Sequence, residues 1–180
     1  CLISLGPGYI KFGQALSTRP DLVGKDTCDF LKTLQDNLKP ISKSIAKKII
    51  NNEHETFLKE SLTFFNEKPI ATASVAQVHA GILKNGKKVA IKILKPNIQK
   101  HLFKDFTFFY WISKCLEFCI PNIKRLKLSK NVEVLSEVSL NELDLTLEAS
   151  AADELSENFK EHPNYKVPKI YWQFTTPNML

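Results

Sequence analysis

The chain has 180 residues, a formal net charge of +6 and a pI near 9.1, with 43% hydrophobic and 24% charged residues. This composition excludes an intrinsically disordered segment, and a chain of this length can bury roughly 70% of its unfolded surface. The excess of positive charge favours an anionic partner such as a nucleotide, an acidic lipid or a nucleic acid.

Helical periodicity dominates the first third of the chain. Asp26 or Thr27 is placed to cap a helix that Pro40 ends. The apolar stripe of this helix comprises Phe30, Leu31, Leu34 and Leu38. Ser42 is placed to cap a second helix, whose apolar residues are Ile45, Ile49 and Ile50. A third helix is predicted to run until Pro69, with apolar residues Phe57, Leu58, Leu62 and Phe65.

The hydrophobic period then changes to alternation, which predicts a β-hairpin. Apolar residues alternate along both strands: Val78, Ala80 and Ile82 on the first, and Val89, Ile91 and Ile93 on the second. Asn85 and Gly86 supply the turn between them. On the second strand, Lys92 is predicted to share a face with Ala90 and Leu94, opposite the three β-branched residues.

After the hairpin, the most apolar stretch of the chain is FTFFYWIS at 106–113, which predicts a buried helix. The charged residues that bracket it are Lys104, Asp105, Lys114 and Glu117. It falls far short of the roughly 20 residues needed to span a bilayer, so no transmembrane segment is expected. A basic group follows, comprising Lys124, Arg125, Lys127 and Lys130. It is interpreted as a solvated loop, with a lipid or nucleic-acid patch as the alternative, although no nucleic-acid motif accompanies it.

The last third predicts a further helical stretch over residues 131–159. Residues at helical spacing are Leu143, Leu147, Ala151, Leu155 and Phe159. Asp144 and Glu148 lie one turn apart on a shared flank of this helix. The final segment, KVPKIYWQFTTPNML at 166–180, predicts a strand, a Thr-Pro-Asn turn and the start of another strand.

Cysteines and histidines are dispersed along the chain without the spacing of zinc ligands. They are Cys1, Cys28, Cys115 and Cys119, and His54, His79, His101 and His162. The cysteines are interpreted as buried thiols of a reducing compartment, and the histidines as structural residues. No metal site is expected from these residues.

The motif VAIK at 89–92 places a lysine on an otherwise aliphatic strand. Taken alone, Lys92 fits a snorkelling strand lysine as well as a ligand for a nucleotide phosphate. The second interpretation needs an acidic partner on a nearby helix, which keeps the ammonium charged and aimed. The order hairpin, strand lysine, helix glutamate, hairpin is that of a protein-kinase small lobe, and VAIK is its strand motif.

The segment before the hairpin departs from an ordinary kinase. Where kinases carry G-x-G-x-x-G over the phosphates, this chain has IATASVAQV at 70–78, without any glycine. Alanine and serine are small enough for close backbone approach, but they disfavour positive φ angles. A stiffer loop and a different nucleotide geometry are therefore expected.

Three short motifs occur in order along the chain. They are KFGQ at 11–14, ATAS at 71–74 and ELD at 142–144, with VAIK between the second and the third. They resemble the K-x-G-Q motif, the alanine-rich loop and the E-x-D motif of the UbiB family of atypical kinases, which supports ubiquinone biosynthesis. The resemblance covers essentially the whole chain.

This resemblance implies that Lys92 binds a phosphate and that Glu148, on the αC helix, pairs with it as the catalytic pair. The implied ATP-binding residues are Lys92 and the segment Ile70, Ala71, Thr72, Ala73, Ser74, Val75, Ala76, Gln77 and Val78. The implied motif residues are Lys11, Gly13, Gln14, Glu142 and Asp144. In the family, the K-x-G-Q helix folds over the site, meets the E-x-D motif and blocks protein substrates. Taken singly, Lys11 fits a surface residue, and Glu142 and Asp144 fit a solvated first helical turn.

The implied fold class is α+β, a kinase-like small lobe with an antiparallel sheet and an αC helix. A helical N-terminal extension is expected over residues 1–68 and the lobe over residues 69–180. The chain is expected to be truncated before the large lobe, and its true N-terminus is expected to precede Cys1.

The implied function is that of the ATP-binding portion of a UbiB-type kinase or ATPase in isoprenoid quinone biosynthesis. The alternative is a catalytically inactive interaction or scaffold module of the quinone-synthesis machinery. The expected cofactors are ATP or ADP with Mg, and the metal ligands, catalytic-loop aspartate and D-F-G motif would lie on the large lobe, so the chain alone is expected to be inactive. Expected partners are a nucleotide and quinone precursors or quinone-synthesis proteins, with a membrane surface left open and no nucleic acid. The resemblance implies the cytoplasmic face of a bacterial inner membrane, or a mitochondrion.

Overall fold

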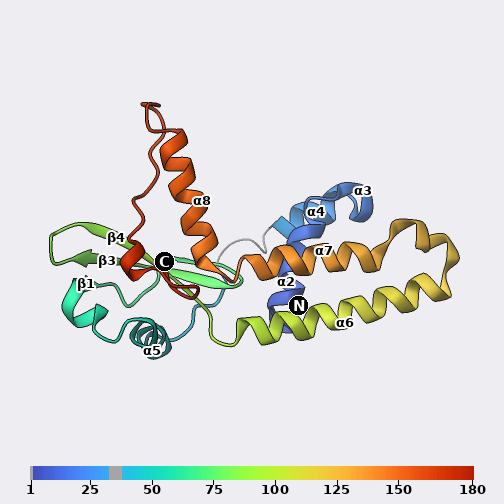
Figure 1. The fold of residues 1–180 in the computed structure, drawn as a ribbon. Helices are drawn as coiled ribbons and strands as arrows, with labels where there is room; N and C mark the ends of the chain where they lie inside the picture. Colours follow the sequence, from blue (N-terminus) through green and yellow to red (C-terminus); the bar gives the residue numbers. More distant parts are fainter. Residues whose placement is uncertain (1, 33–37) are drawn as a thin grey trace. The chain divides into compact units, whose positions relative to one another are not determined.

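The computed structural model describes residues 2–32 and 38–180, so Cys1 and Leu34 lie outside the described residues (Figure 1). The chain divides into two compact units. Unit 1 comprises residues 1–38, 73–75 and 97–141, and unit 2 comprises residues 39–72, 76–96 and 142–180. Each unit is therefore assembled from stretches that are separate in the sequence.

Unit 1 is helical. Its helices are α1 (Leu2–Leu5), α2 (Pro7–Leu16), α3 (Pro20–Val23), α4 (Lys25–Lys32), α6 (Ile98–Cys119) and α7 (Leu128–Asn141), with a 3₁₀ turn, η3 (Pro121–Leu126), between the last two. Helices α6 and α7 run side by side as a long hairpin (Figure 1). The backbone N–H of Gly8 on α2 donates to Asp105 on α6 at 2.9 Å. A Cβ at position 8 would lie 2.3 Å from the Cβ of Asp105, so glycine permits this close approach.

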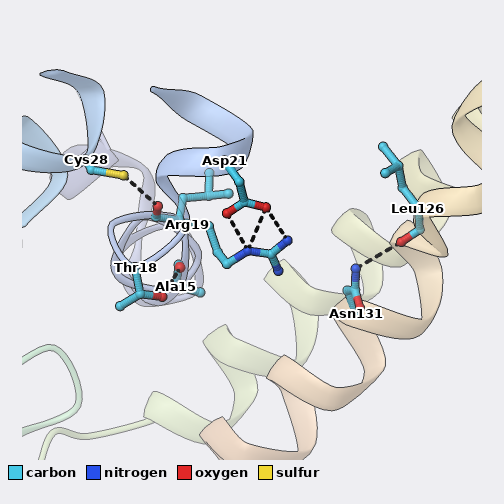
Figure 2. Close-up of polar contacts among 8 residues, drawn as sticks. Ala15, Thr18, Arg19, Asp21, Cys28, Leu126 and Asn131 are labelled. Carbon is cyan, nitrogen blue, oxygen red and sulfur yellow. Dashed lines mark hydrogen bonds and ion pairs between the residues drawn. The ribbon is translucent and has the colours of Figure 1, made fainter. Parts of the chain in front are cut away.

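The helix predicted to start at Asp26 or Thr27 is α4, which already begins at Lys25, so neither residue caps it. Leu31 is buried with Ile10 and Leu38, whereas Phe30 is 69% exposed. Ahead of this helix, Arg19 and Asp21 form a two-pronged ion pair at 2.7 to 2.9 Å, and the Cys28 thiol donates to the carbonyl of Leu16 (Figure 2).

Unit 2 is built around an antiparallel sheet. Its strands are β1 (Leu62–Phe65), β2 (Ala71–Thr72), β3 (Ala76–Leu83) and β4 (Lys88–Leu94). Strand β4 pairs along one edge of β3, and β1 and β2 share the other edge. The helical elements are α5 (Lys43–Glu53), the π turn η2 (Phe57–Ser61), α8 (Leu145–Asn158) and the 3₁₀ turn η4 (Trp172–Phe174).

The core of unit 2 lies between α5 and one face of the sheet. It comprises Ala46, Ile50, Phe57, Leu62, Leu83, Ile91, Ile93 and Met179. Ile91 and Ile93 of β4 are opposite His79 and Gln77 of β3, so these two polar side chains share the buried face. Val78 and Ala80 therefore lie on the other face, together with Lys92 and Ala90. The alternating apolar residues predicted for the first strand thus lie on the opposite face from those predicted for the second.

The predicted hairpin and the helix capped by Ser42 are confirmed. Gly86 adopts a φ of 78°, the left-handed conformation that its turn requires, and the Ser42 hydroxyl accepts from the N–H of Ile45 at 3.4 Å. The helix predicted from Phe57 to Phe65 is wrong. Only residues 57–61 form a helical turn, because Leu62–Phe65 hydrogen-bonds to β3 instead.

Three further expectations need correction. The aromatic run of α6 is helical but not wholly buried, since Trp111 is 68% exposed. The strand predicted from residue 166 is absent, since this stretch is irregular up to η4. Thr176 and Met179 form a bridge across the predicted turn, and Met179 also bridges Ile93 of β4, so the chain after the turn pairs with the sheet. Cys115 and Cys119 are exposed, and only Cys28 among the described cysteines is buried.

Within residues 2–32 and 38–180, no helix combines the length and the hydropathy that crossing a membrane requires.

Candidate functional site

The centre of β4 holds Lys92 by pairing on both of its edges. Lys92 donates its N–H to the carbonyl of Leu180 at 2.7 Å and accepts from the Leu180 N–H at 2.9 Å. On the other side it is opposite Val78 of β3. Since both backbone groups of Lys92 bond to Leu180, its pair with Val78 is the non-hydrogen-bonded type, in which facing side chains approach closely.

A turn over residues 176–179 positions the segment that pairs with Lys92. The carboxylate of Glu53, the last residue of α5, accepts from the Thr176 hydroxyl at 2.6 Å and from the Asn178 amide at 3.0 Å. The N–H of Leu94 donates to the Asn178 carbonyl at 3.0 Å. The end of α5 therefore fixes the turn against β4, and with it the backbone on one side of Lys92.

Helix α8 begins at the same turn. Leu145 donates its N–H to the carbonyl of Pro177 at 2.9 Å, and Asp144 caps the helix by accepting from the N–H of Thr146 at 2.9 Å. This cap breaks the predicted helical stretch at 142–144, so the E-x-D motif lies between α7 and α8. An aspartate at this position accepts a hydrogen bond from a first-turn N–H, and its negative charge interacts favourably with the positive end of the helix dipole.

The first turn of α8 places Glu148 against Lys92. The Lys92 ammonium donates to Oε2 of Glu148 in an ion pair. Their side chains are 29% and 49% exposed, so solvent screens the pair and its contribution to folding stability is small. Because both side chains are partly exposed, an incoming anion can reach the Lys92 ammonium without displacing buried core residues.

A cavity of about 530 Å³ adjoins this ion pair, entirely within unit 2. It lies between β4, α8 and the segment before the last turn. Among its lining residues are Ala90, Lys92, Glu148, Ala152, Ile170, Tyr171 and Leu180. A mostly apolar hollow with one convergent ion pair is typical of a site for a small organic anion, and this volume is within the usual range for such sites.

The alanine-rich segment starts at the edge of the same sheet. Ile70 is 59% exposed and donates its N–H to the carbonyl of Val78 at 2.8 Å. Ala71 and Thr72 pair with Val78 and Gln77. The next three residues, 73–75, are assigned to unit 1, and Ser74 and Val75 are buried. The segment is thus a tight β-hairpin and not an open loop.

An ionic cluster connects the loop before the alanine-rich segment to α5. Lys47 and Lys43 donate to the carboxylate of Glu67 at 2.6 and 3.2 Å. The hydrogen bond from Lys47, followed by that from Lys43, lowers the pKa of Glu67 below its ordinary value. Glu67 precedes β2 by four residues, so its charge is held close to the start of the alanine-rich segment.

The remaining motif residues are divided between the units. Lys11, Gly13 and Gln14 lie on α2 of unit 1, and Lys11 is 9% exposed, so it is not a surface residue. Glu142 and Asp144 belong to unit 2, with Glu142 exposed. The meeting of these two motifs therefore stays a prediction.

In the part of the chain that the structure describes, no group of three or more His, Cys, Asp or Glu side chains is arranged to hold a metal ion. The cavity lining supplies the Lys92–Glu148 ion pair, two further lysines, Lys88 and Lys169, and an apolar wall. These groups suit a phosphate ester attached to an apolar or aromatic moiety.

Comparisons with known proteins identify relatives of this chain. A family model described as the ABC1 atypical kinase-like domain matches residues 33–180. The chain belongs to this family. Proteins named probable protein kinase UbiB are 40% identical in Cellvibrio japonicus and 37% identical in Azotobacter vinelandii, covering 98% and 99% of this chain. The chain spans about a third of their length, namely 32% and 33%.

A solved structure supports the fold of this ABC1-family chain. It is titled as the complex of Rv3197 with erythromycin from Mycobacterium tuberculosis, and it matches with a TM-score of 0.57 and 27% identity. The match covers 93% of this chain and 42% of that protein. The predicted kinase-like class, an antiparallel sheet combined with helices, is confirmed, as is the resemblance to the UbiB family.

Sequence reasoning missed several residues that shape the site. Glu53 carries no motif, and its role depends on a contact with Thr176 that is 123 residues distant. Ile170 and Tyr171 line the cavity from an irregular segment, which periodicity cannot place. The Thr-Pro-Asn turn was the one available signal, since it indicates that the chain folds back at this point.

Proposed function

We propose that this family member binds a nucleotide through Lys92, as the ATP-binding portion of a UbiB-type kinase or ATPase serving isoprenoid quinone biosynthesis. The observation that carries the proposal is the ion pair of Lys92 and Glu148 at the edge of the unit 2 cavity. The relatives named probable protein kinase UbiB support the same class of chemistry.

The proposed roles follow from charge and position. The Lys92 ammonium neutralises phosphate oxygens and holds them at a fixed place, because pairing on both edges fixes its backbone. Glu148 keeps the ammonium aimed at the cavity, and the segment from Ile70 to Val78 contributes backbone near the phosphates. A bound Mg ion would add further charge neutralisation, with ligands proposed to come from outside the described residues.

Further parts of the proposal rest on family membership. Residues 1–68 act as a helical extension and residues 69–180 as the small lobe, and Lys11, Gly13 and Gln14 face Glu142 and Asp144 across the site. Quinone precursors or quinone-synthesis proteins are the proposed partners, at the cytoplasmic side of a bacterial membrane. The chain alone is proposed to bind nucleotide weakly and to hydrolyse none.

Thermal unfolding with and without Mg-ADP tests the proposal on this chain. A ligand at about ten times its Kd stabilises the folded state by about 1.4 kcal/mol, which raises Tm by about 3 to 5 °C at this size. Lys92→Met keeps the aliphatic stem but removes the charge, so this shift should vanish. Lys87→Met, in the turn before β4, removes the same charge outside the cavity lining and should leave the shift intact.

Two results would contradict the proposal. One is an equal shift in the parent and in Lys92→Met, which would place the nucleotide elsewhere. The other is no shift at any ADP concentration, which would favour the interaction or scaffold role. Tm without ligand, measured for each variant, separates lost binding from lost folding.

A further inference from the structure

Helix α6 exposes an aromatic face that the nucleotide proposal does not use. Phe108, Trp111 and Phe118 are 50%, 68% and 89% exposed. Together with Cys115, which is also exposed, they recur at intervals of three and four residues, so they form one stripe along the helix. We call these four residues the aromatic face. Its exposure is unusual, since large aromatic side chains normally pack in the interior.

The packing of unit 1 leaves this face uncovered. The buried residues of α6 are Ile98, Leu102, Phe106 and Ser113, which lie on the opposite side of the helix. Helices α7 and α2 pack against α6. Two shallow apolar hollows instead flank the aromatic face, and both include Trp111 and Cys115 in their lining.

The acidic residues of α6 contact other parts of unit 1, whereas exposed lysines lie beside the aromatic face. The two acidic residues of the helix are engaged within unit 1: Asp105 accepts from the N–H of Gly8, and Glu117 accepts from the N–H and hydroxyl of Ser129. The charged residues exposed along the face are instead Lys104 and Lys114. The rim of the aromatic face is therefore cationic.

The turn that follows α6 extends this cationic rim. Lys124, Arg125 and Lys127, which we call the basic tip, are all exposed on the η3 turn and the residue after it. Asn131 of α7 donates its amide to the carbonyl of Leu126 at 3.1 Å, which closes the turn onto the hairpin (Figure 2). Ile120 and Leu126, 41% and 43% exposed, add apolar surface at the same end.

We propose that the aromatic face and the basic tip form a docking surface for an anionic lipid bilayer. Aromatic rings favour the boundary between headgroups and acyl chains, and basic side chains near it are attracted to anionic headgroups. An amphipathic helix of this kind lies in the interface without crossing it. The surface is independent of Lys92, so its function does not depend on nucleotide binding.

The charge pattern favours a bilayer over a protein partner. A second copy of this chain docked through the same face would bring two cationic rims together, which opposes association. Protein interfaces are also depleted in lysine, whereas lysine forms most of this rim. A bilayer containing acidic lipid satisfies the aromatic and the cationic groups together.

Vesicle co-sedimentation tests the surface with the intact chain. We expect binding to vesicles of phosphatidylcholine mixed with phosphatidylglycerol, little binding to phosphatidylcholine alone, and release as ionic strength rises from about 0.1 M to about 1 M. The double variant Trp111→Ser, Phe118→Ser should lower partitioning about tenfold or more. Reversing the basic tip with Lys124→Glu, Arg125→Glu and Lys127→Glu should lower it by a similar factor.

Matched controls separate this surface from general stickiness. Phe64→Ser removes a 52% exposed aromatic residue on β1, and Lys84→Glu with Lys87→Glu reverses exposed charges on the β3–β4 turn. Both should leave partitioning within about twofold, and all variants should keep the parent Tm and Mg-ADP response. The proposal is overturned by absent binding to acidic vesicles, by unchanged binding in the face and tip variants, or by light scattering that shows these variants lose a dimer.

Discussion

A relay of hydrogen bonds fixes the buried side chains of Gln77 and His79 on the core face of the sheet. The N–H of Ile41 donates to Oε1 of Gln77 at 3.0 Å, which orients the amide. Nε2 of Gln77 then donates to Nε2 of His79 at 2.7 Å, and Nδ1–H of His79 donates to the carbonyl of Asn66 at 2.8 Å. This order of donors requires neutral His79 with its proton on Nδ1.

Gln77→Met should destabilise the chain by about 1 to 3 kcal/mol, because it leaves the partly buried Ile41 N–H and the buried His79 ring nitrogen without a partner. Methionine keeps the volume, so the loss isolates the hydrogen bonds from packing. Urea denaturation measures the change. Gln99→Met on the exposed side of α6 is the control, with an expected change within about 0.5 kcal/mol. Equal effects in the two variants would mean that the relay contributes nothing.

At the scale of elements, Glu117 of α6 caps the start of α7. Its carboxylate accepts from the N–H and hydroxyl of Ser129, each at 2.9 Å. The backbone hydrogen bond is the largest cause that lowers the pKa of Glu117 in the folded state. The contact therefore joins the end of α6 to the start of α7 across the η3 turn.

This cap predicts a defined pH dependence. Because the folded pKa of Glu117 is lowered, its stabilising effect is present above the unfolded value of about 4.3 and is lost as pH falls through the folded value. Glu117→Gln should therefore lower Tm at pH 7, and the difference from the parent should shrink below about pH 4. Glu137→Gln, exposed on α7, should give no such pH-dependent difference. A constant difference for Glu117→Gln across this range would contradict the cap.

The sequence correctly predicted those elements whose conformation is set by neighbouring residues. The Asn85-Gly86 turn and the Ser42 cap depend on neighbouring residues, and both occur. Leu62–Phe65 fits a helical stripe equally well, but it pairs with β3, and that pairing is not visible in the segment itself. The aromatic run of α6 was expected to be buried because hydrophobicity alone cannot show that part of a face has no partner.

Only part of the candidate site was predictable, because some of its residues are positioned by contacts with distant segments of the chain. Family motifs indicated that Lys92 and Glu148 would pair, and the structure places them in contact although 56 residues separate them. The cap formed by Asp144 follows from ordinary helix preferences. The anchor formed by Glu53 does not, since it depends on where a distant turn meets α5.

The whole molecule combines two cores built from discontinuous segments. In unit 1, Leu31 packs with Ile10 and Leu38, and in unit 2, Ile50 is fully buried among residues of α5, η2 and the sheet. The chain passes repeatedly between the units, so each unit is completed by residues from several stretches of the sequence. The two core clusters have no residue in common.

Leu31→Ala and Ile50→Ala test whether the units unfold separately. Each removes a buried aliphatic side chain and should cost about 2 to 5 kcal/mol in its own core. Hydrogen exchange followed by mass spectrometry should show lost protection in residues 2–32 and 97–141 for Leu31→Ala, and in residues 39–72, 76–96 and 142–180 for Ile50→Ala. Ile45→Ala, 40% exposed on α5, is the control and should leave both patterns close to the parent. Loss of protection throughout the chain in either core variant would show that the two units unfold as one cooperative body.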